Sequence, residues 1–228
     1  MNARTGLQGW LLALDTATTT IVVAAGAMDG DVLAADAFEG RYRHSQELLP
    51  AVVRVIERAG LRLADLAGVV VGTGPGAFTG LRVGIATAKT LAHELGCPIV
   101  GVPSSSALLA AVAGATVLWL PSGPRDRVAV VAGAEPVVVP GADPAPQLAS
   151  GAIEVAVDLD GRASEAALAL GRQALAGLPA ALLRLGAERL AAGQRDDAER
   201  LVPSYASPPR GAPSSDSEGG VAWSRDPR

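Results

Sequence analysis

Residues 69–85 read VVVGTGPGAFTGLRVGI, and this stretch decides how the chain folds. An apolar run ends at Gly72 and leads through a turn with four glycines and one proline into an amphipathic pattern. Glycine permits a positive φ or the close approach of another group, and Pro75 fixes one φ within the turn. Apolar residues then recur at steps of three and four from Leu81 to Leu95, which is typical of a packed helix. The stretch therefore predicts a buried strand, a glycine turn and a helix that ends at Gly96.

Two familiar phosphate loops are poor matches to this turn. A Walker A loop needs Lys and then Ser or Thr directly after its last glycine, but Leu81 and Arg82 follow Gly80 here. The relaxed dinucleotide fingerprint G-x-G-x-x-A matches residues 72–77, yet no acid that could hold a ribose follows the next predicted strand, residues 99–102. Two interpretations stay open: the glycines let strand and helix pack closely, or they contact an anion or a partner.

Composition and charge narrow the class of protein. The 228 residues are 49% hydrophobic and 18% charged, enough for one sizeable core or two small ones. A net charge of −4 argues against a protein that binds nucleic acid by bulk electrostatics. The single cysteine, Cys97, excludes an internal disulfide and a cysteine-based zinc cluster. The apolar runs at residues 11–14 and 107–120 are too short for a signal peptide core and a membrane span, so we expect a cytoplasmic protein without membrane segments.

The first half of the chain predicts a mixed sheet covered by helices, in a domain of residues 1–114. Three strand-like runs at the start form an antiparallel meander, and helices and strands then alternate. The expected strands are residues 11–14, 21–25, 32–38, the run ending at 72, and 99–102. The expected helices are residues 45–59, 79–95 and 104–112.

The second half predicts a thinner unit, residues 115–206, that is rich in alanine and proline. Its expected strands are residues 117–120, 128–132 and 153–157, and its expected helices are residues 164–176 and 180–192. Residues 207–228 combine proline, serine, glycine and charge with almost no apolar content, which predicts a disordered tail.

Four stretches of the first half resemble the N-terminal domain of the TsaB family, also called YeaZ. They are LLALDTATTTIVVA, RHSQELLP, VVVGTGPGAFTGLRVGIATAKTLA and CPIVGVPSSSALLA, and the resemblance covers residues 11 to about 113. Membership would imply an α/β fold of the ASKHA (actin-like ATPase) architecture, with a mixed β-sheet and two RNase H-like halves, the second one reduced.

The resemblance also implies a function in tRNA modification. Members pair with TsaD, the subunit that transfers threonylcarbamoyl to N6 of the adenosine next to the anticodon, and TsaE, an ATPase, completes the complex. We therefore expect an accessory, non-catalytic scaffold that activates a TsaD-like subunit, meets tRNA through the complex and forms a homodimer when alone. TsaD carries two metal-binding histidines in a pattern like GVNHLEGH, where this chain has GVPSSSAL. Because Ser104 and Leu108 stand at those places, we expect no metal and no required cofactor.

In this family, the first two helices of the N-terminal domain pack against those of TsaD or of a second copy. The interface predicted from this consists of His44, Leu48, Leu49, Val52, Val53, Ile56, Arg82, Gly84, Ile85, Ala88 and Ala92. Each helix must also cover its own sheet, so the alternative is that these positions form an internal core alone.

A nucleotide or anion site is a second hypothesis, since the fold superfamily handles phosphate and metal at the turn after the first strand. Its candidate contacts are Asp15, Thr16, Gly74, Gly76 and Thr79, with weak binding of ATP or ADP expected at the partner interface. The competing function is a small ATPase or phosphotransferase of the same fold, with Asp15 as the essential acid. In the structural alternative, Asp15 is a turn carboxylate that accepts hydrogen bonds from nearby backbone N–H groups.

Overall fold

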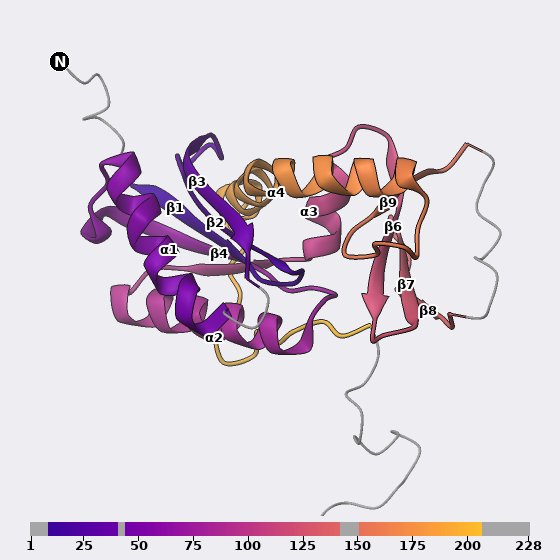
Figure 1. Cartoon of the computed structure of the whole chain (residues 1–228). Coiled ribbons are helices and arrows are strands. Elements are labelled where there is room, and N and C mark those ends of the chain that lie inside the picture. The colour runs from indigo at the N-terminus through magenta and orange to yellow at the C-terminus, as the bar shows by residue number, and fades with distance from the viewer. Residues whose placement is uncertain (1–8, 41–43, 142–150, 207–228) are drawn as a thin grey trace, which may run out of the picture.

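The computed structural model describes residues 9–40, 44–141 and 151–206, which form two β-sheets with helices around and between them (Figure 1). The first sheet has the spatial strand order β3-β2-β1-β4-β5. Its strands are β1 (Trp10–Asp15), β2 (Thr20–Gly26), β3 (Val32–Glu39), β4 (Leu66–Gly72) and β5 (Ile99–Val102). β1, β2 and β3 pair antiparallel, whereas β4 and β5 continue the sheet in parallel with β1. The predicted meander and mixed sheet are confirmed.

The central strands are buried on both faces because nearly all their residues are apolar. In β1, Trp10, Leu12 and Leu14 point to one face of the sheet, while Leu11 and Ala13 point to the other. Each face therefore needs its own cover, and the helices supply it.

Helices cover the two faces of the first sheet differently. α1 (His44–Ala59) and α2 (Phe78–Leu95) lie on one face, and α4 (Glu165–Ala191) crosses the other (Figure 1). α3 (Ser104–Ala110) fills the space between the sheets, and a short 3-10 turn, Leu63–Asp65, precedes β4. α2 ends at Gly96, whose φ of 62° is left-handed, as the sequence predicts.

The second sheet repeats the first in smaller form. Its strands are β6 (Ala115–Ser122), β7 (Asp126–Val131), β8 (Val137–Val139) and β9 (Ile153–Ala156). Their order, β8-β7-β6-β9, reproduces the order β3-β2-β1-β4, including the parallel pairing of the last two. β8 is absent from the predicted strands, because it has only three residues and lies between Pro136 and Pro140. The repeat fits two related halves, the second one reduced.

One prediction about the second half is wrong. The sequence predicts separate helices at residues 164–176 and 180–192, but α4 is a single helix of 27 residues that continues through Pro179. A proline inside a helix removes one hydrogen bond and costs about 3 kcal/mol. The helix continues because side chains on both sides of the proline, including Leu178 and Leu182, are fully buried in the core.

α4 also connects the two sheets. Its N-terminal half packs on β9, and further along Leu183 and Gly186 pack against Gly26 and Val70 of the first sheet. By length and composition alone α4 could cross a membrane, but half of its apolar window is buried inside the protein, as in a core helix. The boundary predicted at residue 115 stays a prediction, since a helix of the second unit covers the first sheet.

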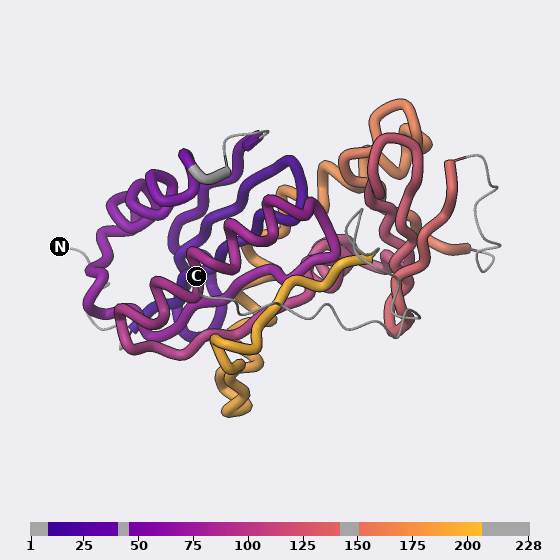
Figure 2. The backbone as a smooth tube through the Cα atoms, turned by 90° about the horizontal axis from the view of Figure 1, so that it is seen from below, coloured from indigo at the N-terminus to yellow at the C-terminus, as the bar shows by residue number. Residues whose placement is uncertain are grey.

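The segment after α4 lies along the free edge of β5. The N–H of Asp196 donates to the carbonyl oxygen of Ile99 at 2.9 Å, and the N–H of Gly101 donates to the Asp196 carboxylate at 2.7 Å. The Arg189 guanidinium donates to the carbonyl oxygen of Gly101. The segment then runs beside α2 (Figure 2). Residues 207–228, for which disorder is predicted, lie outside the described residues.

Candidate functional site

The glycine turn between β4 and α2 meets the end of β1 around the carboxylate of Asp15. One carboxylate oxygen accepts the N–H of Ala17 at 2.9 Å, and the other accepts the hydroxyl of Ser104 at 2.5 Å. The Ser104 oxygen in turn accepts the N–H of Gly74 at 3.0 Å. Gly72 lies against this carboxylate, where a methyl group would overlap it. Asp15 therefore ties β1, the glycine turn and the start of α3 together.

Asp15 is completely buried, and this burial raises the pKa of its carboxyl group. Burial disfavours the charged form, while the hydrogen bonds from Ser104 and Ala17 oppose the rise in pKa. The geometry matches the structural alternative, a turn carboxylate that accepts nearby hydrogen bonds. An enclosed carboxylate with both oxygens engaged does not face a nucleotide.

The other polar groups of the predicted anion site are also used internally. The Thr16 hydroxyl donates to the carbonyl oxygen of Gly80 at 2.7 Å, and Gly84 leaves the room that Thr16 occupies. Gly76 lies against the carbonyl of Ala17, where a methyl group would again overlap. Two residues predicted for different sites, Thr16 and Gly84, are thus in contact with each other.

Of the five residues predicted to contact an anion or nucleotide, the structure brings four together and leaves Thr79 exposed at the start of α2. The four lie where the glycine turn packs on the turn between β1 and β2. This arrangement favours the interpretation in which the glycines permit close packing of the chain on itself.

Six of the residues predicted for the partner interface are buried under α1 and α2. They are Leu48, Val52, Gly84, Ile85, Ala88 and Ala92. Their side chains, or the lack of one at Gly84, face the sheet or the β1–β2 turn, so they are not accessible to another chain. The internal core is the better interpretation for these six, because each helix uses its most apolar stripe to cover its own sheet.

Four of the five remaining predicted residues form what we call the helix-pair surface: Leu49, Val53, Ile56 and Arg82. Leu49 and Val53 are each 52% exposed and lie one turn apart on α1. Ile56 is half-buried on the same helix, and Arg82 is exposed on α2. His44 is the first residue of α1. An apolar pair this exposed is not needed to cover the sheet.

Two features of the helix pair are absent from the predicted interface. Val83 and Leu91 lie about two turns apart on α2 and form a second, half-buried apolar stripe, a signal that was present in the sequence. Phe78 and Tyr205 stack with ring centres 5.0 Å apart, and Arg82 lies over the Phe78 ring at 3.7 Å. No local pattern signals Tyr205, because it comes from the C-terminal segment.

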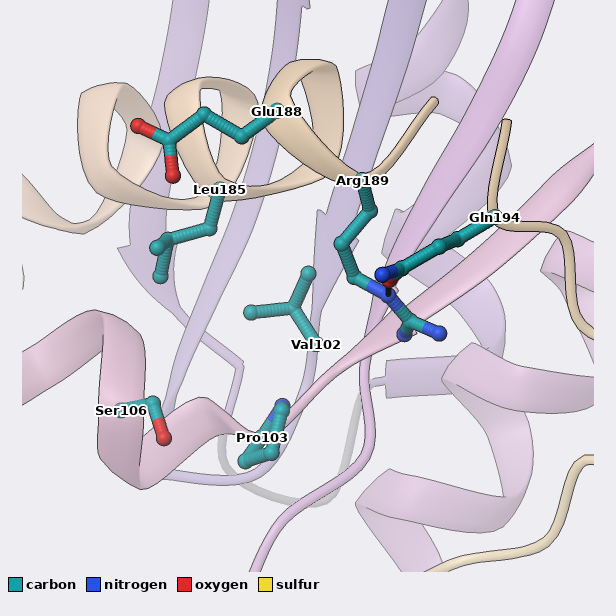
Figure 3. Close-up of a pocket in the computed structure, with 7 residues that line it drawn as sticks. All are labelled: Val102, Pro103, Ser106, Leu185, Glu188, Arg189 and Gln194. Carbon is teal, nitrogen blue, oxygen red and sulfur yellow. Dashed lines mark hydrogen bonds between the residues drawn. The ribbon is translucent and has the colours of Figure 1, made fainter. Parts of the chain in front are cut away.

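A small cavity of about 270 Å³ lies on the opposite side, between α3, the end of β5 and α4 (Figure 3). Val102 and Leu185 form its apolar wall, and Ser106 approaches from α3. Arg189 at its rim is already paired with Asp196. Glu188 is paired with Arg184, so the described residues that line the cavity offer no unpaired charge that would select a ligand.

Ser104 and Leu108, which stand where the TsaD pattern has its two metal-binding histidines, are used for packing in this chain. Ser104 is buried and bonded to Asp15, and Leu108 is fully buried in the core. Within residues 9–40, 44–141 and 151–206, no three His, Cys, Asp or Glu side chains gather in a way that could hold a metal ion.

Comparison with known proteins shows which family has this architecture. The family model described as TsaD, tRNA N6-adenosine threonylcarbamoyltransferase, matches residues 39–181, more than half of the chain. Two relatives are named tRNA threonylcarbamoyladenosine biosynthesis protein TsaB. The one from Bacillus subtilis is 37% identical over 100 residues, which cover 44% of this chain and 43% of the relative. The one from Escherichia coli is 36% identical over 121 residues, which cover 53% of this chain and 49% of the relative.

The solved structure of YeaZ from Pseudomonas aeruginosa superimposes with a TM-score of 0.67 at 25% identity, and the match covers 86% of this chain and 99% of that one. The chain belongs to the TsaB/YeaZ branch of the TsaD family. TsaB/YeaZ proteins have the ASKHA (actin-like) fold, so the predicted fold class is confirmed. The predicted involvement in threonylcarbamoyladenosine biosynthesis agrees with the names of these relatives. The chain spans about half the length of the curated relatives it matches.

Proposed function

We propose that this TsaB/YeaZ chain is a non-catalytic subunit that docks a TsaD-like catalytic subunit through the helix-pair surface. The observation that carries the proposal is the exposed apolar pair Leu49 and Val53 on α1. Their neighbours Leu48 and Val52 cover the sheet, so the helix is apolar on more of its circumference than its own core requires.

The inner side of the helix pair supports this assignment. Ala88 and Ala92 are small and buried, which seats α2 close to the sheet, and α1 is held to β3 by Arg54, which pairs with Asp36 at 2.8 Å. A rigid helix pair with exposed aliphatic side chains suits docking against another helical surface, because little side-chain order is lost on binding.

The test replaces Val53 with Glu and measures binding to the TsaD-like subunit of the same host by calorimetry. A carboxylate at the centre of an apolar contact would be desolvated without a partner, so we expect at least a tenfold loss of affinity. The matched control is Val137→Glu, since Val137 is similarly exposed, at 56%, on β8 of the second sheet. Unchanged affinity for Val53→Glu, with both variants folded, would reject the proposal.

Further roles complete the proposal. We propose a TsaE-like ATPase as a third subunit, contact with tRNA through the complex, a homodimer when the chain is alone, and a cytoplasmic location. Weak ATP or ADP binding is proposed at the junction with the catalytic subunit, because Asp15 and the glycine turn are already engaged within the chain.

A further inference from the structure

A carboxylate from the second half is bound by the turn between β1 and β2. One oxygen of Asp158 accepts the N–H of Thr19 at 2.6 Å, and the other accepts the Thr19 hydroxyl at 2.5 Å. These residues are 139 positions apart in the chain. Charge-assisted hydrogen bonds of this length are among the stronger ones in proteins.

The backbone at Asp158 is unusual in a way that fits this contact. Its φ is 57°, which makes it the single non-glycine residue with a positive φ among those the structure describes. Aspartate tolerates this conformation better than most residues, but a positive φ outside glycine still persists only where the surroundings hold it. The two bonds to Thr19 supply that constraint.

The Asp158 loop is also fastened to its own half. The Arg162 guanidinium donates to the carbonyl oxygens of Asp158, Gly123, Pro124 and Asp126 at 3.3 to 3.5 Å. It therefore joins the loop after β9 to the turn between β6 and β7. The contact between Thr19 and Asp158 therefore connects the first sheet to the second sheet, because the loop that carries Asp158 is itself bonded to that sheet.

Two neighbouring donors, one in the β1–β2 turn and one at the start of β2, have short-range partners. The N–H of Ala17 is taken by Asp15, and the N–H of Thr20 donates to the Thr18 hydroxyl at 3.2 Å. Thr19 is the residue of this turn whose N–H and hydroxyl both donate to the other half of the chain. Its two donors converge on one carboxylate, which is the geometry of an anion site.

A polar cavity of about 430 Å³ surrounds this contact between the halves. Among the described residues, the carboxylates of Asp158, Glu39 and Asp160 and the guanidinium of Arg162 line it. Asp158 occupies the two donors of Thr19 without a free ligand, because its carboxylate belongs to the same chain.

We propose that the β1–β2 turn is an anion site occupied by the chain's own Asp158, and that this contact latches the two sheets together. The ligand class is a carboxylate, and the site is filled from within the molecule. The inference does not depend on the proposed docking function, because the hydrogen bonds that carry it involve Thr19, Asp158 and Arg162 and no residue of the helix-pair surface.

The test replaces Asp158 with Gly, which tolerates the positive φ. The side chain that is removed corresponds to acetate, so added acetate can take its place. We expect the thermal midpoint to fall by at least about 5 °C and the amide of Thr19 to exchange hydrogen at least tenfold faster. Sodium acetate should then restore part of the midpoint and of the Thr19 protection, relative to sodium chloride at equal ionic strength. The wild type should respond equally to both salts.

The matched control is Asp160→Gly, since Asp160 lines the same cavity but has no hydrogen bond to Thr19. It should leave the Thr19 amide protected. A Thr19 exchange rate in Asp158→Gly equal to that of the wild type would overturn the proposal, as would an equal response of both glycine variants to acetate. If Asp158→Gly does not fold, the milder Asp158→Asn and Thr19→Val replace it: non-additive effects on the midpoint support the latch, and strictly additive effects overturn it.

Discussion

Replacing Asp15 with Ala tests whether this buried carboxylate holds the structure together or serves catalysis. The change leaves the Ser104 hydroxyl and the Ala17 N–H without the acceptor they have in the fold. An unsatisfied buried group costs about 1–3 kcal/mol, so the two together cost about 2–6 kcal/mol. Removal of a buried carboxylate, whose desolvation is itself unfavourable, offsets part of this loss. We therefore expect the free energy of unfolding to fall by about 2–4 kcal/mol.

The matched variant is Asp15→Asn, which keeps the shape and one acceptor. It should lose less stability than Asp15→Ala and should remove a pH dependence. Because burial raises the pKa of Asp15 in the folded chain, the folded state keeps its proton over a range in which the unfolded state has lost it. This contribution to stability is fully present below the ordinary pKa and is lost as the pH rises through the folded pKa. Raising the pH should therefore destabilise the wild type relative to Asp15→Asn.

The assay is urea unfolding at several pH values between 4 and 8, followed by the fluorescence of the buried Trp10 and Trp119. ATP turnover is measured on the same samples. The reasoning is refuted if Asp15→Ala is as stable as the wild type, or if the wild type gains stability relative to Asp15→Asn as the pH rises. Steady ATP hydrolysis that is lost in a well-folded Asp15→Asn variant would instead support the enzyme hypothesis.

Two further predictions concern the packing of α4 on β9 and the cover of the edge of β5. Gly171→Ala should lower the free energy of unfolding by about 1–3 kcal/mol in thermal or urea unfolding, because the added methyl group would overlap the carbonyl group of Ala156, which belongs to the backbone and cannot rotate away as a flexible side chain could. A gain in stability from the better helix propensity of alanine would contradict this. Asp196→Ala should leave the N–H of Gly101 without its acceptor at the edge of β5 and give concentration-dependent species larger than those of the wild type in size-exclusion chromatography, since an uncovered edge strand pairs with other chains. The same elution as the wild type at all concentrations would show that the edge is covered by other means.

Local patterns in the sequence were sufficient for most of the first half. Strand β1 is apolar on both faces, the glycine turn precedes a regular apolar stripe, and Gly96 ends α2 where the pattern predicts. Such features depend on neighbours within a few positions, so periodicity and turn chemistry reveal them. The residues of the partner interface were harder to predict from the sequence, because an apolar stripe on a helix can cover the chain's own sheet, a partner or both.

Beyond the first half, contacts between distant residues decided the outcome. α4 continues through Pro179 because the core buries the residues on either side, which outweighs a local preference to break.

By itself, the sequence determined the alternation of strands and helices, the glycine turn and the lack of cysteine pairs. Only the tertiary structure decided that the glycines pack against Thr16 and Ala17. It also decided that Asp15 accepts a hydrogen bond from Ser104 and that Asp158 accepts one from Thr19. The physical reason is that periodicity reports which face of an element is buried, whereas the group that meets that face is chosen by how the elements pack in space.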